Sequence, residues 1–275
     1  MNSFLKNHIT ELKKNFSNPE LELRILLNKS SLNKKHIIFS NFKINDINIL
    51  EFEKTFERRM KREPISKIFN KKSFWKYDFF VNQHVLDPRP ESELIIEKVL
   101  EFYTDKDKPL NILDMCTGSG CLAISLAKEY PKANVTATDI SSNALKIAKI
   151  NANKFGCSSQ INFIQCNILK TLKTYDIVVS NPPYLSEIEY NKTSSEIQFF
   201  EPKIAFIALN DGLEFYEKIS NILPNVLANN SKAFLEIGSS KAQKVINIFK
   251  SNNLHCIKIA KDIQKLNRVL ILNKS

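Results

Sequence analysis

The chain has 275 residues, of which 43% are hydrophobic and 25% are charged, and its formal net charge is +11. This composition is typical of a soluble globular protein, and no apolar stretch approaches the roughly 20 residues of a membrane-spanning helix. The N-terminus lacks the apolar core and the cleavage site of a signal peptide, so we expect a cytoplasmic protein with no membrane partner.

Residues 1–75 predict a small helical domain, because apolar side chains recur there at helical spacing and no glycine interrupts them. The apolar residues form three groups: Phe4, Leu5, Ile9 and Leu12, then Leu21, Leu23, Ile25 and Leu26, then Ile47, Leu50, Phe52 and Phe56. The densest basic stretch, residues 54–76, is a candidate for weak contact with RNA or the ribosome. A chain-wide preference for Lys, Ile and Asn, as AT-rich coding produces, explains the same charge without any such partner.

Residues 73–90, SFWKYDFFVNQHVLDPRP, carry aromatic residues and valines on both sides of the polar NQH sequence at 82–84. This pattern predicts a β-hairpin with its turn at NQH, and residues 76–90 are assigned as a hairpin linker. The next segment, ESELIIEKVLEFY, predicts a helix with acidic residues in its first turn, where the helix dipole favours them. It opens a third domain over residues 91–275.

Strands alternate with helices from residue 110 onward. The candidate strands are 110–115, 134–139, 161–166, 175–180 and 232–238, and the candidate helices are 121–130, 141–155 and 211–227. This order predicts an α/β fold with a parallel sheet covered on both faces, which binds ligands at the carboxyl ends of its strands. Two final strands, 254–260 and 266–273, have no helix between them and predict an antiparallel edge pair.

A glycine loop follows the first strand of this sheet. Gly118 and Gly120 permit close approach of a ligand to the backbone, and Gly118 to Ala123 satisfies the G-x-G-x-x-[G/A] dinucleotide pattern. Asp139 ends the second strand, 21 residues beyond Gly118, where a ribose-binding carboxylate is expected. These residues predict a site for an adenosine cofactor, which is either NAD or S-adenosylmethionine.

The sequence Asn181-Pro182-Pro183-Tyr184 ends the fourth strand and distinguishes these cofactors. Methylation of a planar nitrogen needs hydrogen-bond acceptors that localise its lone pair, and the Asn181 side chain and the Pro182 carbonyl can supply them. Tyr184 can lie against the planar group. A dehydrogenase has no use for this arrangement, so the segment favours S-adenosylmethionine and transfer of a methyl group to an amino or amide nitrogen.

Asn-Pro-Pro-Tyr after such a glycine loop resembles the signature of amino methyltransferases that act on DNA adenine, RNA guanine or protein glutamine. Residues 63–95 resemble the stretch that joins the two domains of the HemK/PrmC family, the protein-(glutamine-N5) methyltransferases of peptide-chain release factors. The resemblance extends through several C-terminal motifs: Glu201-Pro202, Asp211-Gly212-Leu213, Asp262 and Asn267-Arg268-Val269.

The resemblance implies a class I (Rossmann-like) methyltransferase sheet with a helical N-terminal domain and a hairpin linker. It also implies site residues. For the cofactor these are Cys116, Thr117, Gly118, Ser119 and Gly120 at the methionine end, Asp139 at the ribose, Ile168 beside the adenine, and Asn181 nearby. Asn181, Pro182, Pro183 and Tyr184 would hold the target glutamine, with Asn181, Pro182 and Tyr184 as the catalytic residues, and no metal is implied.

Four positions depart from the family pattern. Cys116 replaces a usual glycine, Asn167 replaces a common aspartate, Asp87 replaces an apolar residue, and the usual glycine near the last strand is absent from residues 262–269. The five cysteines and four histidines form no CxxC pair and no i, i+4 histidine pair, so neither a disulfide framework nor a zinc site is expected. Residues 185–209 are either a segment that closes over the substrate or a mobile surface loop.

The expected function is methylation of the side-chain amide nitrogen of the glutamine in the Gly-Gly-Gln loop of release factors, in translation termination, with the N-terminal domain holding the release factor. The nearest alternative is methylation of a ribosomal-protein glutamine. The sequence Pro88-Arg89-Pro90-Glu91 favours the release-factor branch by resemblance. A nucleic-acid amino methyltransferase is a weaker alternative, because no target-recognition domain is evident. A catalytically silent binding module is an alternative of another class.

Overall fold

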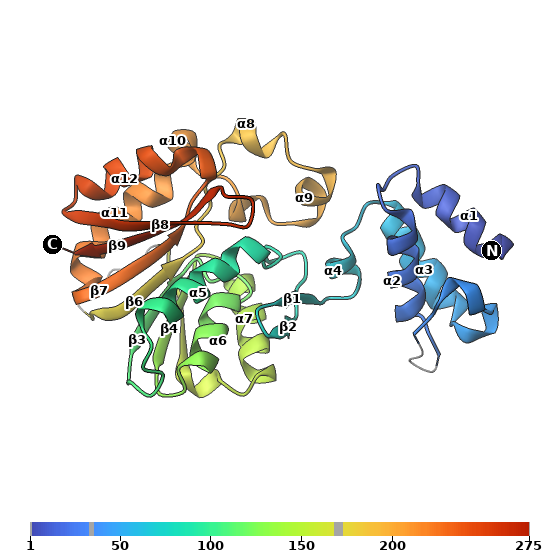
Figure 1. Cartoon of the computed structure of the whole chain (residues 1–275), viewed down its shortest axis with the longest axis horizontal. Coiled ribbons are helices and arrows are strands. Elements are labelled where there is room, and N and C mark those ends of the chain that lie inside the picture. The colour runs from blue at the N-terminus through green and yellow to red at the C-terminus, as the bar shows by residue number, and fades with distance from the viewer. Residues whose placement is uncertain (1, 33–35, 168–172, 275) are drawn as a thin grey trace. The chain divides into compact units, whose positions relative to one another are not determined.

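The computed structural model describes residues 2–32, 36–167 and 173–274 (Figure 1). The chain divides into two compact units, Met1–Phe69 and Asn70–Ser275. Each unit has its own hydrophobic core. Among the described residues, none of the helices combines the length and the apolar character needed to cross a membrane.

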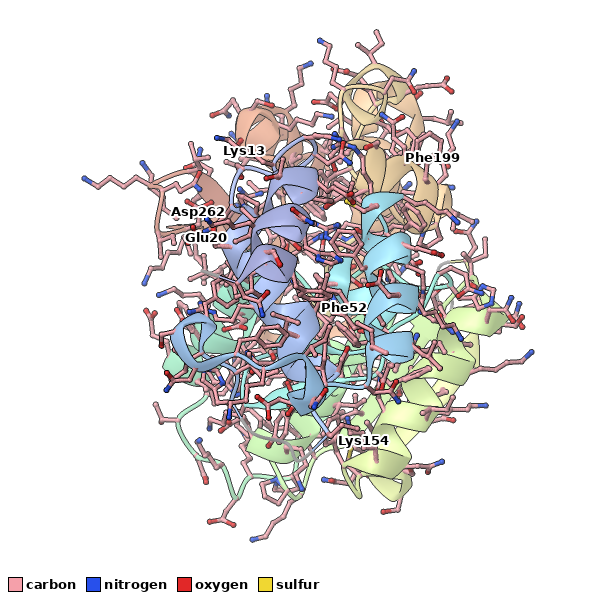
Figure 2. The ribbon with its side chains drawn as sticks, turned by 90° about the vertical axis from the view of Figure 1, so that its right-hand side faces the viewer. Lys13, Glu20, Phe52, Lys154, Phe199 and Asp262 are labelled. Carbon is pink, nitrogen blue, oxygen red and sulfur yellow. The ribbon has the colours of Figure 1, made fainter. Side chains whose placement is uncertain are left out.

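The first unit is helical, as the sequence predicts. Its helices are α1 (Ser3–Leu12), α2 (Pro19–Lys29), α3 (Ile49–Met60) and the short α4 (Ile65–Ile68), with 3-10 turns η1 (Phe39–Asn41) and η2 (Ile44–Asp46). Asparagine side chains cap the starts of the three long helices by accepting backbone N–H groups; the residues are Asn2, Asn18 and Asn48. The apolar faces meet around Phe52, which is fully buried among these helices (Figure 2).

A β-hairpin opens the second unit, but its turn is not at the predicted place. β1 (Lys72–Phe74) pairs with β2 (Tyr77–Phe79), so the hairpin turn is at Trp75 and Lys76. The prediction that residues 82–84 form the hairpin turn is wrong, although the chain does make a turn there, outside the hairpin. Trp75 adopts a positive φ of 54°. Its backbone N–H donates to Glu93 and its indole N–H to Glu129, at 2.8 and 2.9 Å. These two long-range contacts fix a turn that local sequence does not signal.

Seven strands form the main sheet in the order β5-β4-β3-β6-β7-β9-β8. They are β3 (Asn111–Met115), β4 (Asn134–Asp139), β5 (Ile161–Gln165), β6 (Tyr175–Ser180), β7 (Leu227–Glu236), β8 (Leu254–Lys261) and β9 (Asn267–Lys274). The first five are parallel to one another, and β8 and β9 form the predicted antiparallel pair at one edge. β9 is the inner member of that pair and lies beside β7.

Helices cover both faces of this sheet (Figure 1). One face carries α5 (Glu93–Phe102), α6 (Cys121–Glu129) and α7 (Ser142–Lys154), and the other carries α11 (Glu214–Val226) and α12 (Ala242–Lys250). Successive residues of a strand point to opposite faces of the sheet. Ile112 and Ile177 therefore pack with α5 and α6, whereas Leu113 and Val178 pack with α11 and α12. The predicted class I α/β arrangement is confirmed.

Residues 185–209 contain more regular structure than a surface loop. They form α8 (Glu187–Tyr190), α9 (Ser195–Phe200) and the 3-10 turn η5 (Lys203–Ala205), before α10 (Leu209–Gly212). Backbone hydrogen bonds between Leu185 and Phe206 and between Ala208 and Leu185 close the base of the segment at 2.8 and 2.9 Å. Glu201 is buried and accepts hydrogen bonds from the Asp87 backbone N–H and from Arg89, at 2.8 and 2.6 Å.

Candidate active site

The two predicted parts of the site meet where the strand order reverses. β3 and β6 are parallel neighbours, and Met115 pairs with Ser180, so the loops after both strands leave the same edge of the sheet side by side. The Ser180 hydroxyl donates a hydrogen bond of 2.7 Å to the Met115 carbonyl oxygen and ties the two strand ends together. The glycine loop and Asn181 therefore begin from adjacent positions.

The Asp114 carboxylate fixes the conformation of the glycine loop through hydrogen bonds. Its Oδ2 atom accepts hydrogen bonds from the Thr117 hydroxyl at 2.6 Å and from the Ala123 backbone N–H, at the start of α6, at 3.1 Å. Burial raises the pKa of Asp114 to about 7. Asp114 was not among the predicted site residues, although a single carboxyl in an apolar strand was a signal for it.

Three residues of the loop have left-handed backbone angles: Cys116, Gly118 and Gly120, with φ values of 60°, 55° and 81°. The usual family glycine at position 116 thus corresponds to a backbone conformation that side chains disfavour, and Cys116 adopts it nonetheless. Burial raises the pKa of the Cys116 thiol well above its ordinary range, and the nearby carboxyls of Asp139 and Asp114 add to the effect. The thiol therefore stays protonated and is no nucleophile.

A cavity of about 310 Å³ opens at this edge of the sheet. Its walls bring together most of the predicted cofactor residues: Cys116, Thr117, Gly118, Ser119, Asp139, Asn181 and also Asn167. Gly120 lies behind the loop as the N-cap of α6, where an added Cβ would come within 3.1 Å of the Ala148 Cβ. Ile168 lies outside the described residues. Pro183 faces the same cavity, although it was predicted to hold the substrate.

The Asp139 carboxylate offers the hydrogen-bond acceptors that the hydroxyl groups of a nucleoside require. Its Oδ2 atom accepts the Gly118 backbone N–H at 2.9 Å, and its Oδ1 atom accepts the Ser141 backbone N–H at 2.8 Å. These bonds fix the carboxylate while each oxygen keeps a further lone pair for a hydroxyl group. Burial raises the pKa of Asp139 and the three backbone N–H groups around it oppose that rise. The site thus fits an adenosine cofactor with a free ribose diol.

A second cavity, of about 240 Å³, lies on the other side of Asn181. Pro182, Tyr184, Arg89, Glu236 and Arg268 contribute to its walls. Asn181 lines both cavities, so its side chain stands at the boundary between them. A methyl donor in the first cavity and an acceptor in the second would meet at this residue.

The polar groups around Asn181 and Tyr184 are hydrogen-bonded. Asn181 Nδ2 donates to the Ser92 hydroxyl at 2.9 Å, and the Tyr184 hydroxyl donates to Glu236 Oε1 at 3.1 Å. Burial raises the pKa of the Tyr184 phenol, with the Glu236 charge as a further cause, so the phenol keeps its proton at neutral pH. Neither Ser92 nor Glu236 was identified from the sequence.

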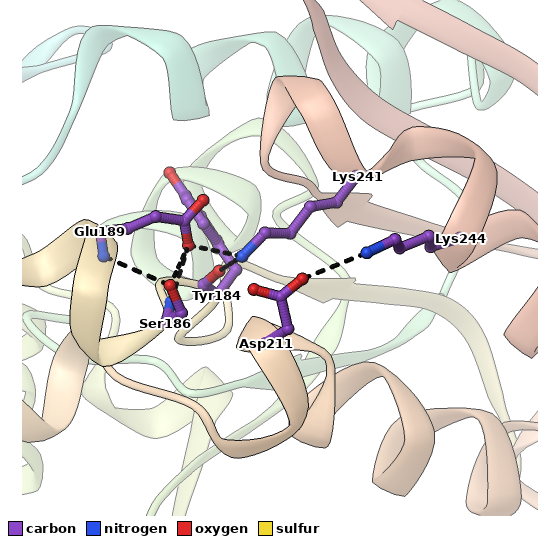
Figure 3. A network of polar contacts seen from close by, with 6 residues as sticks. All are labelled: Tyr184, Ser186, Glu189, Asp211, Lys241 and Lys244. Carbon is purple, nitrogen blue, oxygen red and sulfur yellow. Dashed lines mark hydrogen bonds and ion pairs between the residues drawn. The ribbon is translucent and has the colours of Figure 1, made fainter.

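Lys241 holds the backbone of Tyr184 through a hydrogen bond to its carbonyl oxygen. Lys241 Nζ donates to the Tyr184 carbonyl oxygen at 2.8 Å and pairs with Glu189 Oε2 of α8 at 2.6 Å (Figure 3). Ser186 caps the same helix and hydrogen-bonds Glu189 in turn. The Asn-Pro-Pro-Tyr segment and α8 are therefore tied, through the buried Lys241, to the 3-10 turn η6 (Ser239–Lys241) that precedes α12.

Among the described residues, no group of three or more His, Cys, Asp or Glu side chains is placed to hold a metal ion. The two cavities with Asn181 between them suit the transfer of a methyl group. For hydride transfer the Asn-Pro-Pro-Tyr segment would have no role. The chain thus has the fold and the site of the class I S-adenosylmethionine-dependent methyltransferases.

Comparison with known proteins gives the family. The model of the methyltransferase small domain matches residues 91–201. The release factor glutamine methyltransferase of Flavobacterium psychrophilum is 34% identical over 245 residues, which cover 86% of this chain and 85% of that protein. The corresponding enzyme of Clostridium acetobutylicum is 33% identical over 234 residues, covering 84% and 82%. The chain belongs to the release factor glutamine methyltransferase family.

Other relatives are longer. The bifunctional methyltransferase of Rickettsia prowazekii is 38% identical over 274 residues, which cover 92% of this chain but 53% of that protein, so the chain spans about half the length of these relatives. Among solved structures, the ribosomal protein L11 methylase of Lactobacillus delbrueckii subsp. bulgaricus superposes with a TM-score of 0.51 at 21% identity, covering 69% of this chain and 84% of that one. That likeness shows the fold alone.

Proposed function

We propose that this chain methylates the side-chain amide nitrogen of the glutamine in the Gly-Gly-Gln loop of peptide-chain release factors. The observation that carries the proposal is the position of Asn181 between two cavities, one suited to S-adenosylmethionine and one open to an acceptor side chain. Membership of the release factor glutamine methyltransferase family supplies the substrate class. We propose the cytoplasm as the place of this reaction.

S-adenosylmethionine supplies an electrophilic methyl group when it is bound. Cys116 to Ser119 would surround its methionine end, and Asp139 would accept hydrogen bonds from its ribose hydroxyls. Asn167 would lie toward the adenine, where its amide can donate or accept. Ile168 is proposed beside the adenine on the resemblance alone. Apart from that of Ile168, these roles are supported by the walls of the first cavity and by the lone pairs left on Asp139.

The acceptor amide is a weak nucleophile because its nitrogen lone pair is delocalised. Asn181 Oδ1 and the Pro182 carbonyl oxygen would accept its two N–H groups, which localises the lone pair and aims it at the methyl group. Tyr184 would lie against the planar amide, and its hydrogen bond to Glu236 holds the ring in place. No strong base is required before transfer, because the nitrogen becomes acidic once it is methylated.

The helical unit of residues 1–69 is proposed to hold the release factor so that its loop reaches the second cavity. Contact with RNA or the ribosome has less support. Basic residues in the stretch 54–76 pair with carboxylates within their own units: Arg58 with Glu63, Arg59 with Glu22, Lys71 with Asp78, and Lys76 with Glu129. Neutralised cations contribute little to phosphate binding.

The test is methyl transfer to an isolated release factor and to a matched factor in which the glutamine of the Gly-Gly-Gln loop is replaced by asparagine. The proposal predicts methylation of the first and none of the second, because the shorter side chain does not bring its amide to Asn181. Equal methylation of both factors would contradict it. Methylation of ribosomal proteins alone would assign the acceptor to that alternative.

A further inference from the structure

Two buried polar residues, Ser92 and Glu236, are linked to Asn181 by hydrogen bonds. Ser92 ends the 3-10 turn η3 (Pro90–Ser92) before α5, and Glu236 is the last residue of β7. Their exposed fractions are 2% and 1%. The Ser92 hydroxyl donates a hydrogen bond of 2.5 Å to Glu236 Oε2, and Asn181 Nδ2 donates one of 2.9 Å to Ser92 Oγ. The three residues come from distant parts of the chain and form one continuous row.

We propose that Ser92, held by Glu236, is a positioning residue that turns the side-chain oxygen of Asn181 toward the acceptor amide. This inference deepens the proposed function and rests on it. The two ends of an asparagine amide have nearly the same shape, so packing alone does not decide which end faces the second cavity. If the NH2 group of Asn181 faced the second cavity, it would meet the N–H groups of the substrate amide, which are also donors. The nitrogen that receives the methyl group would then have no hydrogen-bond acceptor at Asn181.

The direction of the hydrogen bonds decides the orientation. A serine hydroxyl has one proton, whereas an ionised carboxylate only accepts. Glu236 accepts from Ser92 on Oε2 and from Tyr184 on Oε1, so both of its oxygens face donors. The Ser92 hydroxyl donates its one hydrogen bond to Glu236, so toward Asn181 it can only accept. Asn181 must therefore turn its NH2 group toward Ser92. Asn181 Oδ1 is then directed away from Ser92.

Hydrogen bonds and a nearby cation favour the ionised form of Glu236 against the effect of its burial. Burial raises the pKa of its carboxyl, while the hydrogen bond from Ser92 and the charge of Arg268 oppose that rise. Arg268 is held by Asp262 Oδ2 at 2.9 Å and lines the same cavity as Glu236. The Arg268 charge thus favours the ionised form of the carboxylate that accepts the Ser92 hydrogen bond.

The place of Ser92 in the chain supports this use of its hydroxyl. A serine directly before a helix ordinarily accepts a backbone N–H of the first turn, which stabilises the helix. Ser92 precedes α5, yet its side chain makes no such capping hydrogen bond. Ser92 has helical backbone angles, φ −70° and ψ −18°, and its hydroxyl is engaged by Glu236 and Asn181.

The experiment compares Ser92→Ala, Ser92→Thr and a matched control, Ser125→Ala, in the full chain. Ser125 is fully buried in α6, and its hydroxyl has no hydrogen-bond partner among the described residues, so its loss removes a buried serine oxygen outside the site. The measurements are kcat for methyl transfer to a release factor, the Kd of S-adenosylmethionine by calorimetry, and the melting temperature.

We expect Ser92→Ala to lower kcat by about 10²-fold relative to Ser125→Ala, because a misdirected amide misplaces the nucleophile. The Kd of the cofactor should stay the same, and Ser92→Thr, which retains the hydroxyl, should recover most of the lost rate. Transfer by Ser92→Ala at the rate of Ser125→Ala would overturn the inference. So would a threonine variant no faster than the alanine variant, since packing and not the hydroxyl would then matter.

A double-mutant cycle tests whether Ser92 acts through Asn181. In the Asn181→Ala chain, the further change Ser92→Ala should cause no additional loss of transfer of a tritiated methyl group. An additional loss equal to that in the unaltered chain would give Ser92 an independent role and overturn the inference. If the unaltered chain binds cofactor but methylates no release factor, the proposed function fails, and the inference fails with it. If the unaltered chain is active and Ser92→Ala has no effect, the inference alone fails, so the two failures are distinguishable.

Discussion

Lys241 Nζ lies 2.8 Å from the backbone carbonyl oxygen of Tyr184, the last residue of the Asn-Pro-Pro-Tyr segment. The lysine is almost fully buried, and Figure 3 shows its ammonium group directed toward Tyr184. A Cβ atom added to Gly212 would lie 2.2 Å from the Tyr184 oxygen and 2.3 Å from Lys241 Nζ. Gly212, one of the residues that carry the family resemblance, is thus required by this contact.

Gly212→Ala should therefore destabilise the chain by about 1–3 kcal/mol more than a matched glycine substitution, because overpacking displaces the Tyr184 carbonyl. Gly156→Ala is the control, since Gly156 also has a positive φ, of 67°, but an added Cβ would meet nothing within 4 Å. Urea unfolding of both variants measures the difference. Equal losses of stability would show that only the backbone angle matters at Gly212.

Lys265 lies in the segment 262–269, from which the usual family glycine is absent. It is exposed and has a φ of 63°, in the turn between β8 and β9. Lys265→Gly should stabilise the chain by about 0.5–1 kcal/mol, because relief of the left-handed strain exceeds the added entropy of the unfolded glycine. Lys265→Ala, which keeps a Cβ, should bring no such gain in urea unfolding. A gain of the same size in both variants would trace the effect to the lysine charge.

Asp114 predicts a dependence of stability on pH. An unfolded aspartate titrates near 3.9, whereas burial raises the pKa of Asp114 to about 7. Between these values the folded chain keeps a proton that the unfolded chain has released, so the contribution of Asp114 to the free energy of unfolding falls as pH rises. That stabilising contribution is present in full below the unfolded pKa and is lost above the folded one.

Asp114→Asn cannot ionise and should lose this dependence. Its free energy of unfolding, relative to that of the unaltered chain, should therefore be higher at about pH 8 than at about pH 5. Urea midpoints at the two pH values measure the change, and the oxygen of the asparagine can still accept from Thr117 and Ala123. A difference between the two chains that stays constant with pH would mean that Asp114 is ionised throughout this range.

Removal of residues 1–69 tests the role of the helical unit. The cut should end at Phe69, because β1 begins at Lys72 and its hairpin packs on the core of the second unit. The shortened chain should bind S-adenosylmethionine with an unchanged Kd, since both cavities lie within the second unit. The KM for an intact release factor should rise. Unchanged kinetics on that substrate would leave the helical unit without a recruiting role.

Much of the fold follows from local patterns that the sequence displays. The strand ends at Asp139 and Ser180 agree with the predicted ones, because an acidic residue and two prolines terminate β4 and β6. The position of β9 beside β7 was not predictable, since periodicity shows that two strands exist but not which of them adjoins the sheet. The hairpin turn at Trp75 depends on Glu93 and Glu129, which are distant in sequence.

The site was predictable where a motif carries it and not where single residues do. Glycine spacing and the double proline identify the loop and Asn181. Ser92 lies in the family-like stretch 63–95 but nothing there signals its role, and Glu236 and Lys241 belong to no recognised motif. Their roles arise from side chains that meet across the carboxyl edge of the sheet. Cys116 and Lys265 differ from these residues, because both have a positive φ that glycine adopts readily and that the sequence does not reveal.

The most direct test of the account is peptide mass spectrometry of a release factor after incubation with S-adenosylmethionine and either the unaltered chain or Asn181→Ala. We predict one added methyl group on the glutamine of the Gly-Gly-Gln peptide with the unaltered chain. With Asn181→Ala that methyl group should be reduced by about 10²-fold or more, while calorimetry shows cofactor binding intact. Near-normal methylation by Asn181→Ala would contradict the proposed role of Asn181, and no methyl group on that glutamine with either chain would contradict the proposed substrate.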